Sequence, residues 1–361
     1  MGITEAPGGG DPPESRRIAA TRLEEFVHDI LCAAGLQSGH AAVAGRLMVA
    51  ADARGADGHG VFRLPQYVRR IESGGINVRP DIRVVQDHPA AALLDGDNGM
   101  GHVVMSRAAD LAIGKARAAG LAWVGVRGSN HAGPAALYAA MALEHDMIGI
   151  YLAIGNANHM APWGGTDALL STNPIAIAVP ARQHPPVILD MATTAVAYGR
   201  VKRTIARGEA IPAGWLIDRT GHPLTDPGKV GEGTLLPAGG YKGYGLALMF
   251  GLLAGTLNGA AFGRSVVDFN SDFASPTNTG HAIMAVDVSC FADVASFKAH
   301  VDAACEEITS SRPIEGGGPV RIPGERSAAT LARSLRDGVL VSADVIGELN
   351  RLAASYRARQ L

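Results

Sequence analysis

The 361-residue chain has few cysteines, few aromatic residues and almost no net charge. Its three cysteines, Cys32, Cys290 and Cys305, are scattered and odd in number, which argues against a disulfide framework and favours a reducing compartment. The formal net charge is −2 and no basic block occurs, so nucleic acid is not an expected partner. We therefore expect a cytoplasmic protein.

Several signature motifs are also missing from the sequence. There is no Cys-x-x-Cys pair and no closely spaced histidine pair, so no metal site is expected. The Gly-x-Gly-x-x-Gly fingerprint, the P-loop and the Gly-x-Ser-x-Gly elbow are absent, which disfavours a Rossmann domain, a P-loop domain and a serine hydrolase. The longest apolar run, residues 246–257, is shorter than the roughly 20 residues of a membrane span, and we predict a buried core helix there.

Helical spacing dominates the N-terminal part. Residues 1–15 are rich in Gly, Pro and acidic residues, which indicates a disordered tail. The charges at Arg22 and Glu24 interrupt any apolar stretch after the Arg16-Arg17 pair, so no export signal is expected. The region from 16 to about 73 is predicted to be helical. Apolar residues recur at helical spacing from Leu23 to Leu31, a second helix is predicted at 39–54, and a third from near Val61 to the glycine pair at 74–75.

Helices and strands alternate in the middle of the chain. Strands are expected at 92–94, 121–126, 147–153, 175–179 and 187–189. Helices are expected from a cap at Ser106 to Gly120, from Pro134, over 194–206 and after Gly245. The tail, 297–361, is predicted to be helical and broken by three glycines at 316–318. We expect a tail (1–15), a helical part (16–88), an α/β core (89–290) and a second helical part (291–361) that packs on the first.

Two short segments place a histidine in a glycine-bearing turn. Residues 58–63 read Gly-His-Gly-Val-Phe-Arg, and the four-residue spacing of His59, Arg63 and Tyr67 would align them on one helix face. Arg63 can grip a carboxylate with two hydrogen bonds. An exposed helix start with a stacked Arg and Tyr is the structural alternative.

The second segment, residues 129–134, reads Ser-Asn-His-Ala-Gly-Pro and lies between a predicted strand and a predicted helix. Backbone N–H groups at a helix start favour anions, and an imidazole with a pKa of about 6.5 exchanges protons near neutral pH. His131 is therefore a candidate acid–base group, with a buried or capping histidine as the alternative. Together the two segments suggest acid–base chemistry on a small anionic substrate.

Other polar turns are candidates for ligand contacts. In residues 239–245 the glycines and Lys242 can approach an anion, although a plain turn into a helix explains them equally well. Asp190 follows a predicted strand and can cap a helix or bind a ligand hydroxyl. The turns at 155–159 and 171–174 are each weak signals alone.

The order of these motifs resembles the malate/L-lactate dehydrogenase family, which lacks a Rossmann fold and includes ureidoglycolate and sulfolactate dehydrogenases, diketogulonate reductase and Δ1-piperideine-2-carboxylate reductases. The resemblance covers about residues 16–326. It is carried by the segments 51–55, 59–61 with Arg63 and Tyr67, 130–131, 162–165, 171–174, 190–194, 242–246 and 323–325.

The resemblance implies an NAD(P)-binding α/β fold with a mixed sheet, usually a homodimer, and hydride transfer between NAD or NADP and C2 of a small 2-hydroxy or 2-oxo acid. It implies His131 and His59 as catalytic residues. The implied substrate contacts are Arg63, Tyr67, Asn130 and His159. The implied cofactor contacts are Asn156, Thr172, Asn173, Asp190, Met191, Ala192, Lys242 and Gly243.

Two departures from the family pattern bear on substrate choice. Many members have Ser where this chain has Gly58, and a smaller group is common at the position of His159. Two alternatives therefore stay open: an NADPH-dependent reductase of a cyclic imine carboxylate, and a non-catalytic ligand-binding relative.

Overall fold

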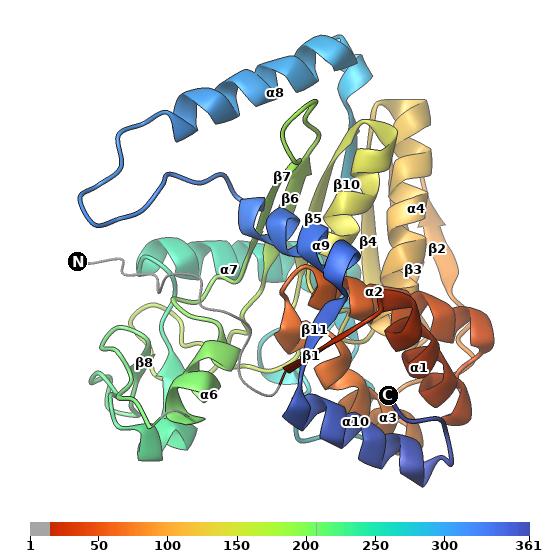
Figure 1. The fold of residues 1–361 in the computed structure, drawn as a ribbon, viewed down its shortest axis with the longest axis vertical. Coiled ribbons are helices and arrows are strands. Elements are labelled where there is room, and N and C mark those ends of the chain that lie inside the picture. Colours follow the sequence, from red (N-terminus) through yellow and green to blue (C-terminus); the bar gives the residue numbers. More distant parts are fainter. Residues whose placement is uncertain (1–14, 207) are drawn as a thin grey trace.

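The computed structural model describes residues 15–206 and 208–361. Its centre is a seven-stranded mixed sheet in the order β2-β3-β4-β10-β5-β6-β7 (Figure 1). The β3–β4 pair is parallel and the other neighbours are antiparallel. The strands are β2 (Arg83–Asp87), β3 (Ala91–Asp95), β4 (Leu121–Ser129), β5 (Met147–Ala153), β6 (Ile175–Val179), β7 (Val187–Met191) and β10 (Thr279–Asp287).

The middle position of this sheet is filled by β10, which the sequence analysis did not predict. Ile283 lies opposite Val124 of β4 and opposite Tyr151 of β5. Most of β10 is buried, as expected for a strand with neighbours on both edges and layers on both faces. The predictions for β5 and β6 are confirmed to the residue, whereas β4 is longer than predicted and β7 includes Asp190.

One face of the sheet is covered by α4 (Gly101–Ala119) and the short α5 (Ala136–Ala139), which share an apolar cluster with the strands. The predicted cap at Ser106 is wrong, because α4 begins five residues earlier and the Ser106 hydroxyl donates to the carbonyl of His102 within the helix. The predicted end at Gly120 is confirmed, since this glycine has a φ of 83°, which other residues rarely adopt.

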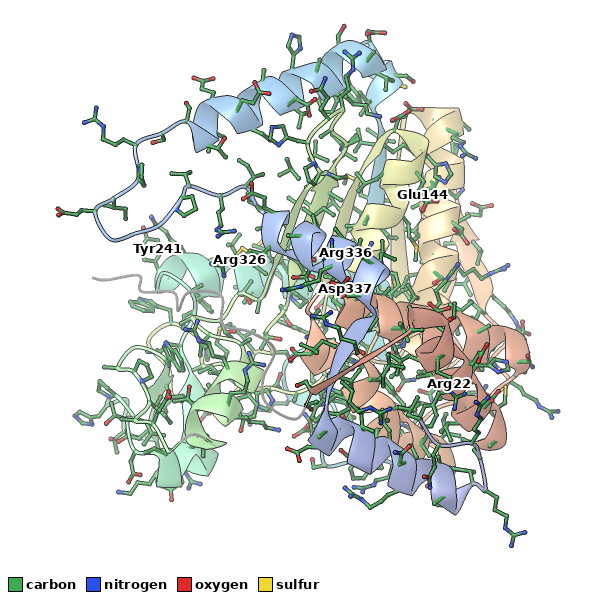
Figure 2. All side chains as sticks on the ribbon, viewed as in Figure 1. Arg22, Glu144, Tyr241, Arg326, Arg336 and Asp337 are labelled. Atoms are coloured by element: carbon green, nitrogen blue, oxygen red, sulfur yellow. The ribbon has the colours of Figure 1, made fainter. Side chains whose placement is uncertain are left out.

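The opposite face of the sheet is covered by α7 (Tyr241–Ala254), whose Phe250 packs against Leu152 and Ala282. The prediction of a fully buried helix is wrong. Leu246, Met249 and Leu252 are 44%, 52% and 37% exposed, and Tyr241 projects from the start of the helix (Figure 2). Because α7 carries apolar residues on every side, the face that points away from the sheet is apolar as well. Across the parts of the chain the structure describes, no helix combines the length and hydrophobicity needed to cross a membrane.

The two ends of the chain meet in a second apolar cluster beside the sheet. It includes α1 (Ala20–Ala33), α2 (Ser38–Ala53), α3 (Leu64–Glu72) and α10 (Ala343–Ser355). Within it β1 (Ser15–Ile18) pairs with β11 (Val339–Ser342), two strands in regions where only helix was expected. The predicted tail, apart from Ser15, lies outside the described residues. The domain boundaries at 88/89 and 290/291 stay a prediction.

The third predicted helix begins near Val61 as expected, but its first residues, Val61–Arg63, form a 3-10 turn before α3 starts at Leu64. A separate 3-10 turn, Asp57–His59, ends at Gly60, whose backbone is non-helical with ψ −143°. Like α3, α6 (Tyr198–Ala206) starts later than predicted, in a small unit that also holds β8 (Leu216–Ile217) and β9 (Thr234–Leu235).

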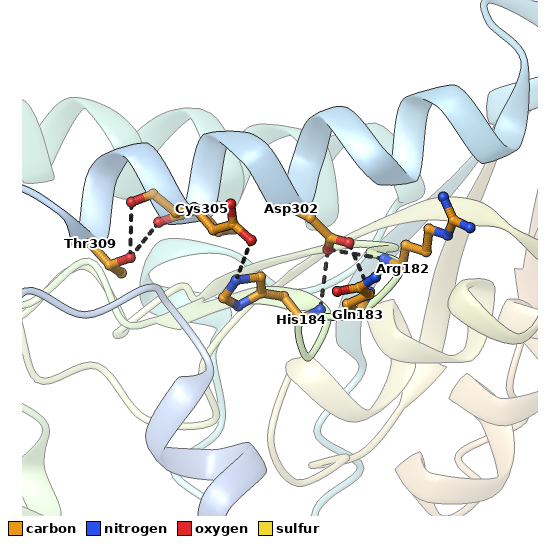
Figure 3. Close-up of polar contacts among 7 residues, drawn as sticks. Arg182, Gln183, His184, Asp302, Cys305 and Thr309 are labelled. Atoms are coloured by element: carbon orange, nitrogen blue, oxygen red, sulfur yellow. Dashed lines mark hydrogen bonds and ion pairs between the residues drawn. The ribbon is translucent and has the colours of Figure 1, made fainter.

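The helix α8 (Val294–Thr309) lies apart from the helical cluster, at the top of Figure 1. It is tied to the β6–β7 loop by Asp302, whose carboxylate accepts hydrogen bonds from the backbone N–H groups of Arg182, Gln183 and His184 (Figure 3). A loop with glycines at 316–318 leads to α9 (Glu325–Asp337).

Candidate active site

The two histidine segments come together beside the end of β4. His131 lies on the loop after β4, and His59 ends the first 3-10 turn. Their rings are stacked with 5.4 Å between centroids and 22° between planes. The Tyr67 hydroxyl lies 2.5 Å from Nδ1 of His131. Residues more than 60 positions apart in the sequence thus form one cluster.

Arg63 stands at the edge of this cluster. Its Nε donates to the carbonyl of Gly58 at 2.9 Å, and Nη1 donates to Gln66 at 2.7 Å. The guanidinium carbon lies 5.5 Å from the centre of the Phe269 ring. Within residues 15–206 and 208–361, Nη2 makes no hydrogen bond, so this nitrogen can donate to a ligand. The expected alignment on one helix face is wrong, because α3 begins only at Leu64.

Asn130 fixes the loop that carries His131. Its side-chain nitrogen donates to the carbonyls of Asn98 and Gly99, each at 3.0 Å, and its oxygen accepts from the Thr277 hydroxyl at 3.1 Å. The residue is buried, so these protein contacts satisfy its amide. The structure therefore places the Asn130 side chain beneath the loop.

Burial sets the charge state of His131. Desolvation, followed by the nearby His59 and Arg63, lowers the pKa of His131 well below 6.5, so the ring is neutral at pH 7. Desolvation also raises the pKa of Tyr67, whose hydroxyl stays protonated. The N–H of Gly133 can only donate, and it lies 3.4 Å from Nδ1 of His131. Nδ1 is thus the acceptor, and the neutral ring carries its proton on Nε2.

Sequence reasoning missed two aromatic neighbours of His131. The Phe269 ring stacks on the imidazole, with centroids 4.8 Å apart and planes 19° apart. His102, the second residue of α4, is fully buried and meets the Tyr67 ring edge-on. Its two ring nitrogens have no hydrogen-bond partner in the described part of the chain. Phe269 lies in an irregular segment without periodicity and His102 resembles any core residue, so neither carried a local signal.

Asp52 of α2 lies in the segment 51–55 that carried the family resemblance, and its role was not predicted: it holds the turns around His59. Its Oδ2 accepts from the Val61 N–H at 2.8 Å. A Cβ on Gly60 would lie 2.0 Å from Asp52 Oδ1, so only glycine fits beside this carboxyl group. Desolvation raises the pKa of Asp52 to about 8, against the effect of the Val61 hydrogen bond. Asp52 is thus a buried carboxylic acid at neutral pH.

This raised pKa predicts how stability depends on pH. Between the ordinary pKa of 3.8 and about 8, the unfolded chain ionises Asp52 while the folded chain keeps it protonated, so the unfolding free energy falls as pH rises. Asp52→Asn cannot titrate and still accepts from Val61. We expect the Tm of this variant to fall less than that of the parent between pH 5 and 8, by roughly 1–1.5 °C for each kcal/mol of pH-dependent unfolding free energy that the substitution abolishes. The exposed Asp110→Asn is the control, and equal pH slopes in thermal melts for Asp52→Asn and the parent would contradict the interpretation.

Most of the residues predicted to contact a cofactor lie just after β5, just before β6 and at the end of β7. Asp190 accepts from the N–H of Ala136 at 2.9 Å, so it meets the start of α5. Although the residue is exposed, desolvation by surrounding protein raises the pKa of its carboxyl group to about 6. Met191 and Ala192 follow Asp190 in the chain, and β7 ends at Met191. The Thr172 carbonyl accepts from Thr193.

Two predicted cofactor contacts have buried side chains with protein partners. Asn173 accepts from the Gly155 N–H and donates to the carbonyl of Ala247. Asn156 donates to the Thr279 hydroxyl at 2.5 Å. Their amides therefore hold the strand ends in place.

The glycine turn before α7 provides the strongest fit to an anionic group of a cofactor. Gly239 and Gly240 have φ values of 63° and 68°, and a Cβ on Gly240 would meet the Trp163 ring at 3.1 Å. No side chain caps α7 in the described structure, so its first N–H groups are available. Lys242 in the first turn is exposed, and Gly243 is buried against Ala238. These donors suit a phosphate.

His159 lies outside the ring stack of His131. Its ring stacks on Tyr198 of α6 with 4.5 Å between centroids. Desolvation lowers the pKa of the imidazole, against the effect of the nearby Asp268 charge. Among the residues that the structure describes, neither His159 nor Lys242 makes a hydrogen bond or ring contact with His59, Arg63, Tyr67 or His131, the four residues that the structure brings together.

Comparison with known proteins places this geometry in a family. Residues 18–350 match the model of the malate/L-lactate dehydrogenase family. The structure of malate dehydrogenase from Pyrococcus horikoshii is 36% identical, with a TM-score of 0.89 over 98% of this chain and 99% of that chain. The fold class predicted from the sequence is confirmed.

Two curated relatives carry a cofactor in their names. The NAD(+) ureidoglycolate dehydrogenase of Escherichia coli K12 is 33% identical over 91% of this chain and 93% of its own length. The NADP(+) (2R)-3-sulfolactate dehydrogenase of Chromohalobacter salexigens is 33% identical over 94% of this chain and 99% of its own length. The chain therefore belongs to the malate/L-lactate dehydrogenase family and is an NAD(P)-dependent oxidoreductase of a small acid.

Proposed function

We propose that the protein transfers a hydride between a nicotinamide cofactor and C2 of a small 2-hydroxy or 2-oxo acid, with His131 as the acid–base residue. The observation that supports the proposal is the meeting of His59, Arg63 and His131 beside the C-terminal end of β4. A proton-exchanging ring and a guanidinium side by side suit a substrate with an oxygen at C2 and a carboxylate next to it.

His131 moves the proton in this proposal. In reduction, charge grows on the carbonyl oxygen at C2, and the imidazolium gives its Nε2 proton to that oxygen. The neutral ring that remains carries its proton on Nδ1, and this N–H donates a hydrogen bond to the Tyr67 hydroxyl, which has turned from donor to acceptor. In oxidation the steps are reversed: the resting ring first moves its proton from Nε2 to Nδ1, and the free Nε2 then takes the hydroxyl proton. Tyr67 thus serves as a positioning residue for both tautomers, and His59 borders the same space.

Arg63 holds the substrate carboxylate through its free Nη2 and fixes C2 relative to the cofactor. A misplacement of 1 Å can cost about 100-fold in rate, so this grip matters for the chemical step. The Phe269 ring under the guanidinium and the Gly58 carbonyl on Nε keep the side chain in place.

The cofactor supplies or accepts the hydride at C2. We propose that the glycine turn with Lys242 and Gly243 binds a cofactor phosphate and that Asp190, Met191 and Ala192 line the cofactor path. Thr172, Asn173 and Asn156 shape the adjoining strand ends, and His159 forms an outer substrate contact. Asp190 is suited to accept a ligand hydroxyl, because it lies at the end of β7 with one oxygen engaged by Ala136.

The decisive experiment is a screen of absorbance at 340 nm with NADH and NADPH against a panel of small 2-oxo acids and cyclic imine acids. Acid-dependent oxidation of either cofactor supports the proposal. Cofactor binding without turnover of any substrate would instead favour the non-catalytic alternative.

The lowered pKa of His131 predicts the pH dependence of reduction. The imidazolium is the required acid, and its fraction falls as pH rises through a pKa below 6.5. We expect kcat/KM for reduction to rise about tenfold per unit as the pH falls from 8 to 6.5, without levelling off, since this parameter reports the free enzyme. Stopped-flow or steady-state pH profiles measure this. A profile that already bends towards a plateau near pH 6.5 would show that His131 titrates at its ordinary pKa.

The same observation favours one alternative, the reduction of a cyclic imine carboxylate. An iminium nitrogen arrives already protonated, so a neutral His131 at pH 7 is no obstacle to the hydride step. Piperideine- or pyrroline-carboxylate reduction that exceeds 2-oxo acid reduction and survives His131→Asn would establish this alternative.

We also propose that the protein is a cytoplasmic homodimer. The outward apolar face of α7, with Leu246, Met249 and Leu252, is the surface that a second copy would cover. Sedimentation analysis of the parent and of Met249→Glu tests this, and a monomeric parent would end the dimer proposal.

A further inference from the structure

Arg70 of α3 is the largest fully buried side chain in the described structure, with 1% of its surface exposed. Its guanidinium donates to the carbonyl of Asp272 and, through Nη2, to those of Gly75 and Ser275 at 2.9 and 2.8 Å. No carboxylate hydrogen-bonds it within the described residues, although the negative charge of Asp272 partly opposes the lowering of its pKa by burial. A buried charge that is held mainly by neutral carbonyls is costly, so its presence needs an explanation.

The carbonyls that hold Arg70 belong mainly to one loop, residues 266–278, between α7 and β10. Gly75 allows a close approach, because a Cβ there would lie 2.2 Å from the Phe273 carbonyl. The loop is also turned on itself, since the Asp272 carboxylate accepts from the N–H groups of Ala274 and Ser275. Arg70 is therefore the main polar link between α3 and the second half of this loop.

The first half of the same loop forms part of the candidate active site. It carries Phe269, which stacks on His131, and Asn270, which receives a hydrogen bond from Arg63 at 3.5 Å. It is held by Gln66, which lies one turn before Arg70 on α3 and donates to the Phe269 carbonyl at 2.9 Å. A shift of this loop would therefore move both Phe269, the neighbour of His131, and Asn270, the neighbour of Arg63.

Arg70 also reaches the base of the His131 loop. Its Nη2 lies 3.4 Å from the side-chain oxygen of Asn130, the residue before His131. The Thr277 hydroxyl, from the end of the 266–278 loop, donates to the same oxygen at 3.1 Å. The guanidinium and the loop thus converge on the amide that anchors the catalytic histidine.

We propose that Arg70 is a positioning residue for catalysis, which holds the 266–278 loop against α3 and thereby sets Phe269 against His131 and Asn270 against Arg63. The inference rests on the proposed function for its kinetic consequence. Arg70 touches neither substrate nor cofactor, and acts through the loop.

The test compares Arg70→Met and Arg70→Lys with Arg69→Met. Arg69 is the matched control, because it is exposed on the same helix and its guanidinium lies 4.8 Å from the Phe273 ring of the same loop. We expect Arg70→Met to lower kcat/KM for the acid substrate about 100-fold. Arg70→Lys should fall between Arg70→Met and the parent, and Arg69→Met should match the parent. The dissociation constant of the cofactor should stay within about twofold in all of them.

Hydrogen exchange of the amides in 266–278 gives a readout that needs no turnover. It should quicken in Arg70→Met and stay unchanged in Arg69→Met. Wild-type kcat/KM in Arg70→Met, or an unchanged loop exchange, would overturn the inference. If Arg70→Met does not fold, the same two outcomes are read from Arg70→Lys. If the parent protein shows no activity on any substrate, the proposed function is refuted. The exchange data then still decide whether Arg70 holds the loop.

Discussion

His131→Asn is expected to reduce turnover of 2-oxo acids by about 10²- to 10⁴-fold, the usual contribution of a positioned acid or base. Asparagine fits in the space between Tyr67 and Phe269 but cannot exchange a proton. Cofactor affinity should be retained, because no cofactor candidate contacts His131 in the described structure. Steady-state kinetics together with cofactor titration by fluorescence measure both quantities.

The control for this variant is His88→Asn. His88 is exposed, and its backbone carbonyl accepts from Lys115, which is not part of the His131 cluster. This control should behave as the parent does. Near-normal turnover of His131→Asn on every accepted 2-oxo acid would remove His131 from the acid–base role, and the loss of cofactor binding would point to a collapsed site instead.

Arg63→Ala is expected to raise KM for carboxylate substrates about 10- to 150-fold. This range corresponds to the loss of about 1.5–3 kcal/mol for hydrogen bonds to a charged group. Arg63→Lys should recover only part of it, because an ammonium group lacks the planar fork and cannot reproduce the contact with the Gly58 carbonyl.

An uncharged substrate separates the role in binding from a general disturbance of the site. With the amide of the same 2-oxo acid, the parent and Arg63→Ala should differ little, since the carboxylate is the group that Arg63 recognises. Equal losses for the acid and the amide would contradict a carboxylate grip and indicate that Arg63 serves mainly to hold Gln66 and Phe269.

The sequence predicted those elements whose signal is local. An apolar run with clear boundaries was enough for β5 and β6, and Gly120 marked the end of α4. The strands β1 and β11 are four residues each and exist because they pair across the whole length of the chain, which no local pattern encodes. The central strand β10 was missed although its segment is mostly apolar.

The same distinction applies to the candidate site. His59, Arg63, Tyr67 and His131 were found from glycine-bearing motifs and from the family resemblance, and the structure places them in one cluster. The roles of four other residues arise only from tertiary contacts. Phe269 stacks on His131, His102 is a buried imidazole, Asp52 holds the turn at Val61, and Arg70 is a buried guanidinium. Such contacts depend on the fold and leave no mark on neighbouring residues in the sequence.

The late position of β10 in the chain has a consequence for biosynthesis. Strands β4 and β5 follow each other in the chain and pair on their outer sides with β3 and β6, yet the edge of each that faces β10 has no partner until residues 279–287 have been made. About 130 residues of synthesis separate β5 from that strand, and at 5–20 residues per second this interval lasts on the order of ten seconds. Throughout this interval, the apolar edges of β4 and β5 that will pair with β10 both remain exposed. We therefore expect the nascent chain to bind chaperones during this time.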